Sequence, residues 1–351
     1  MEEENVYANR PRILLTGARR CGKTSIQKVV FEKMSPHETL FLESTSQLEI
    51  KHIANNPYIQ YEVWDISGDI ALQEGILYNG EILTPSMIFS GNVAMVYVID
   101  AQEEVISDSC LKLKELIQIA TSVNKNIHIE VFIHKVDGEM FGMDYQKWDC
   151  QREIKSQVLL ELEDSEIDMI FNFALTSIYD HSIWEGLSKV IQGRIPQLAY
   201  MENLLNSLMA ECNFEKVFFF DVVSKIYIAT DHNPVDIRVY ELCSDMIDVV
   251  VDVSCIYGMS EDGGDEIAYD EGSSSVIRLS EGAGIYLKQV ASYLGVVCYG
   301  RNANLEKKGL IDFNVDQFKS YFLEIFENKA DTIKDETLES KVTEAKEASE
   351  E

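Results

Sequence analysis

The sequence has no paired cysteine motif and no long apolar run. Its seven cysteines are an odd number and none stands in C-x-x-C spacing, so neither a disulfide framework nor a zinc site is supported. No stretch reaches the roughly 18 apolar residues that a membrane helix needs, and the first residues lack the basic and apolar parts of a signal peptide. We therefore expect a chain of the reducing cytosol, without a membrane span of its own.

Basic residues are also scarce. The chain has 30 lysines and arginines against 60 aspartates and glutamates, a formal net charge of −30. This acidic excess argues against direct binding of nucleic acid or anionic lipid, and it predicts partners with basic surfaces. The chain begins Met-Glu and ends EASEE, so we expect neither myristoylation nor prenylation. Any residence on a membrane should then be peripheral and should depend on partners.

The stretch GARRCGKTS, residues 17–25, follows an apolar strand pattern and precedes a helical one. It matches G-x-x-x-x-G-K-[ST], in which Gly17 and Gly22 let the backbone turn sharply and present its N–H groups to an anion. Lys23 and the helix N-terminus add positive charge at the same point. The pattern predicts a polyphosphate site, with the Lys23 amine on the β- and γ-phosphates and the Thr24 hydroxyl on Mg²⁺.

A second motif, HKVD, ends the apolar strand NIHIEVFIHKVD, at the edge where ligands gather in open parallel sheets. The Asp137 carboxylate can accept hydrogen bonds from the ring N–H and the exocyclic amine of guanine, which adenine cannot match. Lys135 would lie along the base, and the backbone of Ser177 and Ile178 could meet the guanine carbonyl oxygen. Alone, HKVD would suggest a surface Lys–Asp pair. After a phosphate loop, it predicts a guanine reader.

Between these motifs lies YIQYEVWDISGD, a predicted strand that ends at Asp65. The D-x-x-G spacing to Gly68 would let the carboxylate hold a Mg²⁺-bound water and let the glycine N–H meet the γ-phosphate. The motifs therefore stand in the order expected of one nucleotide site.

The chain is long enough for two domains. Up to Pro196, apolar runs alternate with helical stretches, which is typical of a doubly wound α/β sheet. Beyond it the pattern becomes helix, two strands, helix, three strands and helix, as in a helix-covered antiparallel α+β sheet. We predict a flexible arm, a nucleotide domain, a second domain and a disordered acidic tail, over residues 1–11, 12–196, 197–328 and 329–351. Residues 260–275 read as an acidic insertion loop, more than as a docking motif for a basic partner.

Four segments, SIQKVVFEKMSPHETLFLEST, FIHKVDG, LTSIYDHSI and YELCSDMIDVVVDVSCIYG, resemble the Rag family of small GTPases, in its C/D type, known in yeasts as the Gtr proteins. The similarity runs from about Arg12 to about Tyr257. It implies a Ras-like P-loop GTPase domain followed by a roadblock/longin-type dimerisation domain. It also implies GTP or GDP with Mg²⁺ as cofactors, and an obligate heterodimer with an A/B-type Rag through the C-terminal domain.

The resemblance also implies a cellular role, further partners and a set of nucleotide-site residues. Such heterodimers recruit the TOR kinase complex to the lysosome or vacuole when amino acids suffice, with a scaffold complex and a GTPase-activating protein as further partners. The matching nucleotide positions are Gly17, Arg20, Cys21, Gly22, Lys23, Thr24, Ser25, Thr39, Thr45, Gly68, His134, Lys135, Asp137, Ser177 and Ile178. The metal ligands would be Thr24, Thr45 and, through water, Asp65, with Thr39 as the alternative to Thr45.

Some positions depart from ordinary Ras-like proteins. Hydrolysing GTPases usually place a glutamine after the D-x-x-G glycine. This chain has Asp69, a carboxylate that cannot donate an N–H and would repel the γ-phosphate. Arg19, in the phosphate loop, either crowds the γ-phosphate or compensates the charge of Asp69. His134 replaces the common asparagine, as in the family itself, so base recognition is kept but the phosphate loop could be tethered more loosely.

Two functions therefore stay open. The first is a nucleotide-dependent switch with slow, activator-assisted GTP hydrolysis, for which Lys23 and Asp69 are the catalytic candidates. The second is a nucleotide-binding structural subunit without meaningful hydrolysis, whose partner carries the switch.

Overall fold

The computed structural model describes residues 10–69, 72–163, 171–257, 269 and 272–326. The chain divides into two compact units, each described here by itself. The first holds residues 1–198, 220–228 and 234–247, and the second holds residues 199–219, 229–233 and 248–351. The domain boundaries expected from the sequence stay a prediction.

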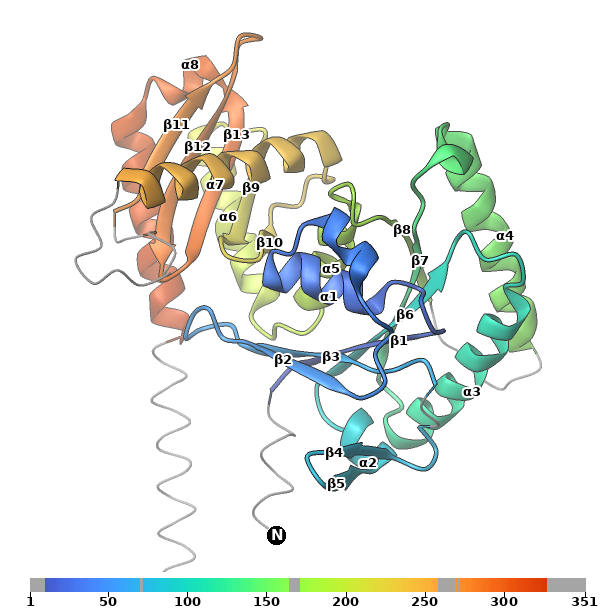
Figure 1. Ribbon diagram of the computed structural model, residues 1–351. Helices are drawn as coiled ribbons and strands as arrows, with labels where there is room; N and C mark the ends of the chain where they lie inside the picture. The colour runs from blue at the N-terminus through green and yellow to red at the C-terminus, as the bar shows by residue number, and fades with distance from the viewer. Residues whose placement is uncertain (1–9, 70–71, 164–170, 258–268, 270–271, 327–351) are drawn as a thin grey trace, which may run out of the picture. The chain divides into compact units, whose positions relative to one another are not determined.

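Six strands form the sheet of the first unit (Figure 1). Across the sheet they are β2 (Glu49–Ile53), β3 (Tyr61–Asp65), β1 (Arg12–Gly17), β6 (Val93–Asp100), β7 (His128–His134) and β8 (Asn172–Thr176). Neighbouring strands run parallel, except that β2 pairs with β3 antiparallel. The inner strands β1 and β6 are largely apolar because both of their faces are buried. The predicted α/β sheet is thus confirmed.

Helices cover both faces of this sheet. The core beneath one face joins Leu14 and Met95 to the helices α3 (Ser107–Val123) and α4 (Asp144–Glu163). On the other face α5 (Ser182–Gln192) packs so closely on Phe132 that a Cβ on Gly186 would lie 3.0 Å from its ring. The helices of the unit are α1 (Lys23–Glu32), α2 (Pro85–Phe89), α3 (Ser107–Val123), α4 (Asp144–Glu163) and α5 (Ser182–Gln192), with the 3₁₀ turns η2 (Pro36–Phe41) and η3 (Glu139–Phe141). A small hairpin, β4 (Ile76–Tyr78) and β5 (Glu81–Leu83), forms a separate two-stranded sheet.

Five strands form the second sheet. Across it they are β10 (Ile226–Thr230), β9 (Lys216–Asp221), β13 (Leu294–Arg301), β12 (Ala283–Ala291) and β11 (Ser274–Arg278). The pairs β11–β12 and β12–β13 are antiparallel. The helices that accompany them are α6 (Leu198–Cys212), α7 (Ile237–Tyr257), α8 (Asn302–Leu305) and residues 308–326. The succession of helix, two strands, helix, three strands and helix agrees with the sequence prediction. None of the described helices is long and apolar enough to cross a membrane.

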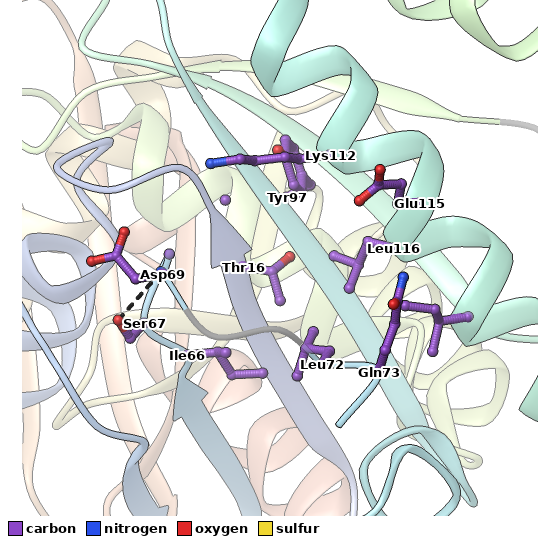
Figure 2. Close-up of a pocket in the computed structure, with 13 residues that line it drawn as sticks. Thr16, Ile66, Ser67, Asp69, Leu72, Gln73, Tyr97, Lys112, Glu115 and Leu116 are labelled. Carbon is purple, nitrogen blue, oxygen red and sulfur yellow. Dashed lines mark hydrogen bonds between the residues drawn. The ribbon is translucent and has the colours of Figure 1, made fainter. Parts of the chain in front are cut away.

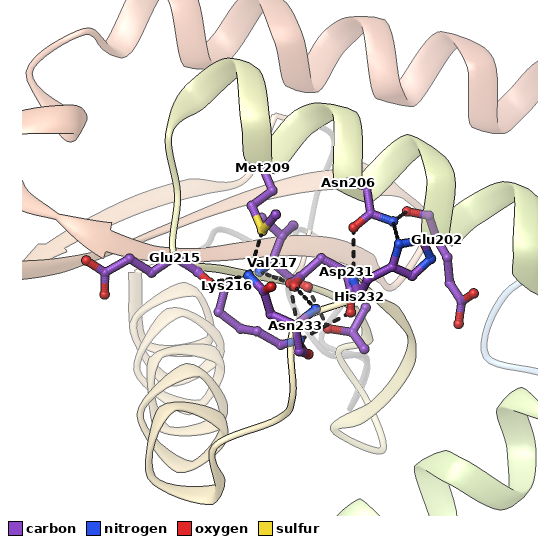
Figure 3. Close-up of polar contacts among 10 residues, drawn as sticks. Glu202, Asn206, Met209, Glu215, Lys216, Val217, Asp231, His232 and Asn233 are labelled. Carbon is purple, nitrogen blue, oxygen red and sulfur yellow. Dashed lines mark hydrogen bonds and ion pairs between the residues drawn. The ribbon is translucent and has the colours of Figure 1, made fainter.

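A buried ion pair joins β9 to the residues that follow β10 (Figure 3). Lys216 is 4% exposed, and its Nζ lies 3.2 Å from Asp231 Oδ2 and donates to the carbonyl oxygen of Asn233 at 2.5 Å. Asp231 also accepts hydrogen bonds from the backbone N–H groups of Val217 at 2.7 Å and Asn233 at 2.8 Å. Both charged groups therefore have their partners within the protein, which is the condition for burying an ion pair without a large penalty.

Candidate functional site

The phosphate loop connects β1 to α1 at the carboxyl edge of the parallel sheet. Gly17 and Gly22 have φ angles of 137° and 109°, in a region that favours glycine. A Cβ would also be blocked at both positions, at 2.3 Å from the Val98 carbonyl oxygen for Gly17 and at 2.6 Å from His134 Cδ2 for Gly22. The two glycines that the motif requires are thus demanded by backbone conformation and by close packing.

Lys23 occupies the first turn of α1 and is 5% exposed. Its Nζ donates hydrogen bonds to the carbonyl oxygens of Gly17 at 3.0 Å and Ala18 at 2.8 Å. No carboxylate of the described residues forms an ion pair with it, although a buried ammonium is costly without a counter-ion. The helix N-terminus adds further positive character, so this point favours an anion.

Three oxygen-bearing side chains meet beside Lys23. Thr24 Oγ1 donates to Asp65 Oδ2 at 2.5 Å and lies 2.5 Å from Thr45 Oγ1, which is 3.4 Å from the same carboxylate oxygen. Burial raises the pKa of Asp65, and its Oδ1 is a buried atom with no partner in the described part of the chain. Thr39, in contrast, donates to Pro36 O within η2 and does not join the cluster. Two threonine hydroxyls and one carboxylate, whose Oδ1 has no partner among the described residues, form a set that suits a hard divalent cation such as Mg²⁺.

The segment after β3 lies against the phosphate loop. A Cβ on Gly68 would be 2.5 Å from the Arg19 backbone nitrogen, so only glycine fits there. Arg19 Nη1 lies 3.5 Å from Asp69 Oδ2, and Arg19 Nη2 donates to Ser44 Oγ at 2.7 Å. Of the two roles that the sequence left open for Arg19, this contact favours charge compensation of Asp69.

The ends of β6, β7 and β8 bring the base-reading motif to the same edge. Asp100 pairs with His134 in the strand register, and His134 pairs with Thr176. Lys135 Nζ contacts Asp100 Oδ2 at 2.5 Å and the Arg20 carbonyl oxygen at 2.8 Å, which anchors the base motif to the phosphate loop.

His134 lies beneath the loop and is fully buried. Its Nδ1 is 2.9 Å from Thr176 Oγ1. Burial, with a smaller contribution from the Lys135 charge, lowers the pKa of His134 to about 3, so the ring is neutral at physiological pH. Because Gly22 packs directly on this ring, His134 supports the loop by close contact.

The Asp137 side chain is oriented by its neighbours. Ser177 Oγ donates to Asp137 Oδ1 at 2.9 Å. The Ser177 N–H donates to Ser182 Oγ at 2.9 Å, whereas no acceptor for the Ile178 N–H is found among the described residues. Of the two predicted backbone donors to a base, Ile178 is therefore the available one.

Comparison with known proteins identifies the family. The Gtr1/RagA G protein conserved region matches residues 12–247. Ras-related GTP-binding protein D of Mus musculus is 46% identical over 95% of this chain and 72% of its own length, and protein C of Homo sapiens is 47% identical over 91% and 78%. The gtr2 protein of Schizosaccharomyces pombe is 45% identical over 90% and 98%. The chain belongs to the Rag family of small GTPases and is of the C/D type.

A Rag of this type is a GTP-binding GTPase, so guanine nucleotide is the ligand class of the site. Part of the chain is also similar to a solved structure. Myxococcus xanthus MglB is 14% identical over 38% of this chain and 92% of its own, with a TM-score of 0.30, which is too low to support a fold assignment. The roadblock assignment of this Rag's second domain stays a prediction.

A hollow of about 410 Å³ adjoins the Gly68 segment (Figure 2). It is lined by Thr16 and Gly17 of β1, by Tyr97 of β6, by residues 66–69, 72 and 73, and by four side chains of α3, Lys112, Glu115, Leu116 and Ile119. Neither Lys23 nor Asp137 lines it. The hollow therefore adjoins the nucleotide site of this Rag and shares Gly17, Gly68 and Asp69 with it.

Several contact residues of the site were missing from the sequence prediction. Asp100 is the ion-pair partner of Lys135, and Gln102 Nε2 donates to the carbonyl oxygens of Lys135 at 2.9 Å and Asp137 at 3.2 Å. The one available signal was the apolar strand VAMVYVID, which ends at Asp100 on the same edge of the sheet. The participation of Ser44 could not be predicted, since it depends on a hydrogen bond from Arg19, which lies 25 positions away in the sequence.

Proposed function

We propose that this chain is the guanine-nucleotide-binding regulatory subunit of a Rag heterodimer that signals amino-acid sufficiency to the TOR kinase complex at the lysosome or vacuole. The observation that carries the nucleotide part is Lys23, a buried ammonium beside a helix N-terminus with no carboxylate partner among the described residues. The signalling role, the scaffold complex and the peripheral location on the lysosome or vacuole rest on family membership alone.

In this proposal each side chain has a defined task. Lys23 binds the β- and γ-phosphates, and the buried His134 ring supports the loop above it. Thr24 and Thr45, with Asp65 through a water molecule, would hold Mg²⁺, which when bound neutralises phosphate charge. Asp137, oriented by the Ser177 hydroxyl, accepts the two donors of the guanine edge.

Competition between nucleotides tests the base assignment. The purified protein should bind GTP in preference to ATP in the presence of Mg²⁺. Asp137→Asn should move the preference from guanine toward xanthine, because the xanthine carbonyl that replaces the amine suits an amide donor. Equal binding of ATP and GTP by the unchanged protein would rule out the assignment.

We further propose that GTP hydrolysis is slow and needs a GTPase-activating protein. Asp69 stands where a water-orienting amide is usual, and its carboxylate is engaged by Arg19. Single-turnover hydrolysis should be faster, or at least no slower, in Asp69→Gln. A marked fall would instead mean that Asp69 positions the attacking water. The alternative, a structural subunit without meaningful hydrolysis, stays open because Asp69 replaces the glutamine, and it predicts no turnover even with an activator.

The heterodimer is proposed to form through the second domain. Val249, Val253 and Ile256 follow one another at helical spacing on α7 and are 50%, 49% and 71% exposed. Apolar stripes of this kind are usually covered, and an obligate interface should bury about 2,000 Å² or more.

Light scattering on the full chain co-expressed with an A/B-type Rag tests this interface. A 1:1 complex is expected, and it should persist in Lys23→Ala because pairing does not need nucleotide. Val253→Asp should disrupt it, whereas the control Leu160→Asp, at an exposed leucine on α4, should not. A soluble monomer that ignores the partner would contradict the proposal.

A further inference from the structure

Arg19 contacts two segments that are far apart in the sequence. Its guanidinium donates through Nη2 to Ser44 Oγ at 2.7 Å and reaches Asp69 Oδ2 through Nη1 at 3.5 Å. One side chain of the phosphate loop therefore bridges the segment before β2 and the segment after β3.

Both partners adjoin residues of the nucleotide site. Ser44 precedes Thr45, whose Oγ1 lies 2.5 Å from Thr24 Oγ1. Asp69 follows Gly68, whose backbone packs against Arg19 itself. Any interaction that fixes the position of the Arg19 guanidinium therefore affects both segments, the one with Thr45 and the one with Gly68.

The Arg19–Asp69 ion pair has an electrostatic effect at the expected γ-phosphate position. A carboxylate at position 69 next to a γ-phosphate would add repulsion between two anions, and a guanidinium within ion-pair distance reduces it. We propose that Arg19 is a positioning residue that links the Thr45 and Gly68 segments and neutralises Asp69, so that the two segments respond to GTP as one unit. This inference rests on the proposed nucleotide function of the same site.

The size of the effect is limited by exposure. The Arg19 and Asp69 side chains are 56% and 62% exposed, and exposed ion pairs are weak and screened by salt. We therefore expect the link to change the preference for GTP over GDP by about 3-fold, not by orders of magnitude.

A double-mutant cycle measures the link. The ratio of GTP to GDP affinity is determined for the full-length protein, Arg19→Gln, Asp69→Asn and the double variant, at low and at high salt. Arg19→Gln should lower the ratio by about 3-fold, and it should do so much less in the Asp69→Asn background, because the interaction is already lost. The exchanged pair Arg19→Asp with Asp69→Arg should restore part of the ratio, and high salt should shrink every difference.

A matched pair elsewhere serves as control. Arg152 and Asp149 form an exposed ion pair at 2.5 Å on α4, and Arg152→Gln should leave the ratio unchanged. Ser44→Ala should reduce the ratio in the same direction as Arg19→Gln. The inference is overturned if the effects of Arg19→Gln and Asp69→Asn simply add, or if Arg152→Gln has the same effect. Loss of all nucleotide binding by the unchanged protein would instead refute the proposed function.

Discussion

Lys23 and Lys216 are both almost completely buried, yet their surroundings differ in one respect. Lys216 has the Asp231 carboxylate 3.2 Å away, and that carboxylate is held in turn by two backbone N–H groups. Lys23 has two backbone carbonyl oxygens and, among the described residues, no carboxylate within ion-pair distance, although burial raises the pKa of the nearby Asp65 and the Lys23 charge acts to lower it. One lysine carries its counter-ion within the fold, and the other has a place for an anion.

This difference separates a structural charge from a binding charge. Burying an ammonium is unfavourable unless an anion accompanies it. Where the anion is a side chain, the pair belongs to the stability of the fold. Where the anion must come from outside, the stabilisation appears only when the ligand binds.

The largest expected effect is the loss of the internal pair. Lys216→Met should lower the free energy of unfolding by about 3–5 kcal/mol, because Asp231 is left as a buried and uncompensated charge. Urea denaturation of the full chain measures this loss. Adding Asp231→Asn should recover part of it, since the amide oxygen can still accept a backbone N–H. A cost below about 1 kcal/mol for Lys216→Met would contradict the structural role of the pair.

Lys23→Met should reduce nucleotide affinity and leave the stability of the fold nearly unchanged. GTP affinity should fall about 100-fold, equivalent to about 2.7 kcal/mol. The free energy of unfolding without nucleotide should change little, because the replaced side chain has a similar volume and no internal ion pair is broken. Titration calorimetry and urea denaturation of the same preparation check the two statements. A large loss of stability without nucleotide would place Lys23 in the same class as Lys216.

His134 is a third buried basic group, and unlike the two lysines it is neutral at physiological pH. Its pKa in the folded state is about 3, below the unfolded value of about 6.5. Between these values the unfolded state binds the proton and the folded state does not, so stability is lost as pH falls. From pH 7 to pH 5 the loss should be about 2 kcal/mol. Urea denaturation of the unchanged protein and of His134→Asn is compared at each pH. The difference separates the contribution of His134 to the free energy of unfolding from that of the other histidines. Equal pH slopes would contradict the neutral assignment.

The same comparison can be made between two buried carboxylates, Asp65 of the nucleotide site and Asp231 of the internal ion pair. Unlike Asp231, Asp65 has a buried oxygen with no described partner, and burial raises its pKa. Between the unfolded and the raised folded pKa, the folded state binds the extra proton, so the contribution of Asp65 to stability falls as pH rises. Asp65→Asn should remove this dependence and should lower the gain in GTP affinity that Mg²⁺ provides by about 10-fold. Nucleotide titrations with and without Mg²⁺ test this expectation. An unchanged Mg²⁺ dependence would exclude Asp65 from the metal site.

The sequence predicted those parts of the fold and site that depend on local pattern. The glycines of the phosphate loop and the apolar parallel strands could be read from spacing and periodicity, because their geometry is set within a few residues. The edge strand β2, EIKHI, could not, since its residues show no regular alternation of buried and exposed side chains and give a weak signal. The Arg19 contacts and the orphaned oxygen of Asp65 depend on segments brought together by the sheet, so no local pattern contains them.

Thermal unfolding with and without Mg²⁺ and GTP tests the central comparison most directly. The full-length protein, Lys23→Met and Lys216→Met are compared at one nucleotide concentration well above the dissociation constant of the unchanged protein. GTP should raise the unfolding temperature of the unchanged protein, and it should raise that of Lys216→Met by a similar amount from a lower starting value. Lys23→Met should start near the unchanged protein and show little or no rise. A full nucleotide-dependent rise in Lys23→Met, or its loss in Lys216→Met, would contradict the assignment of one buried lysine to the ligand and the other to the fold.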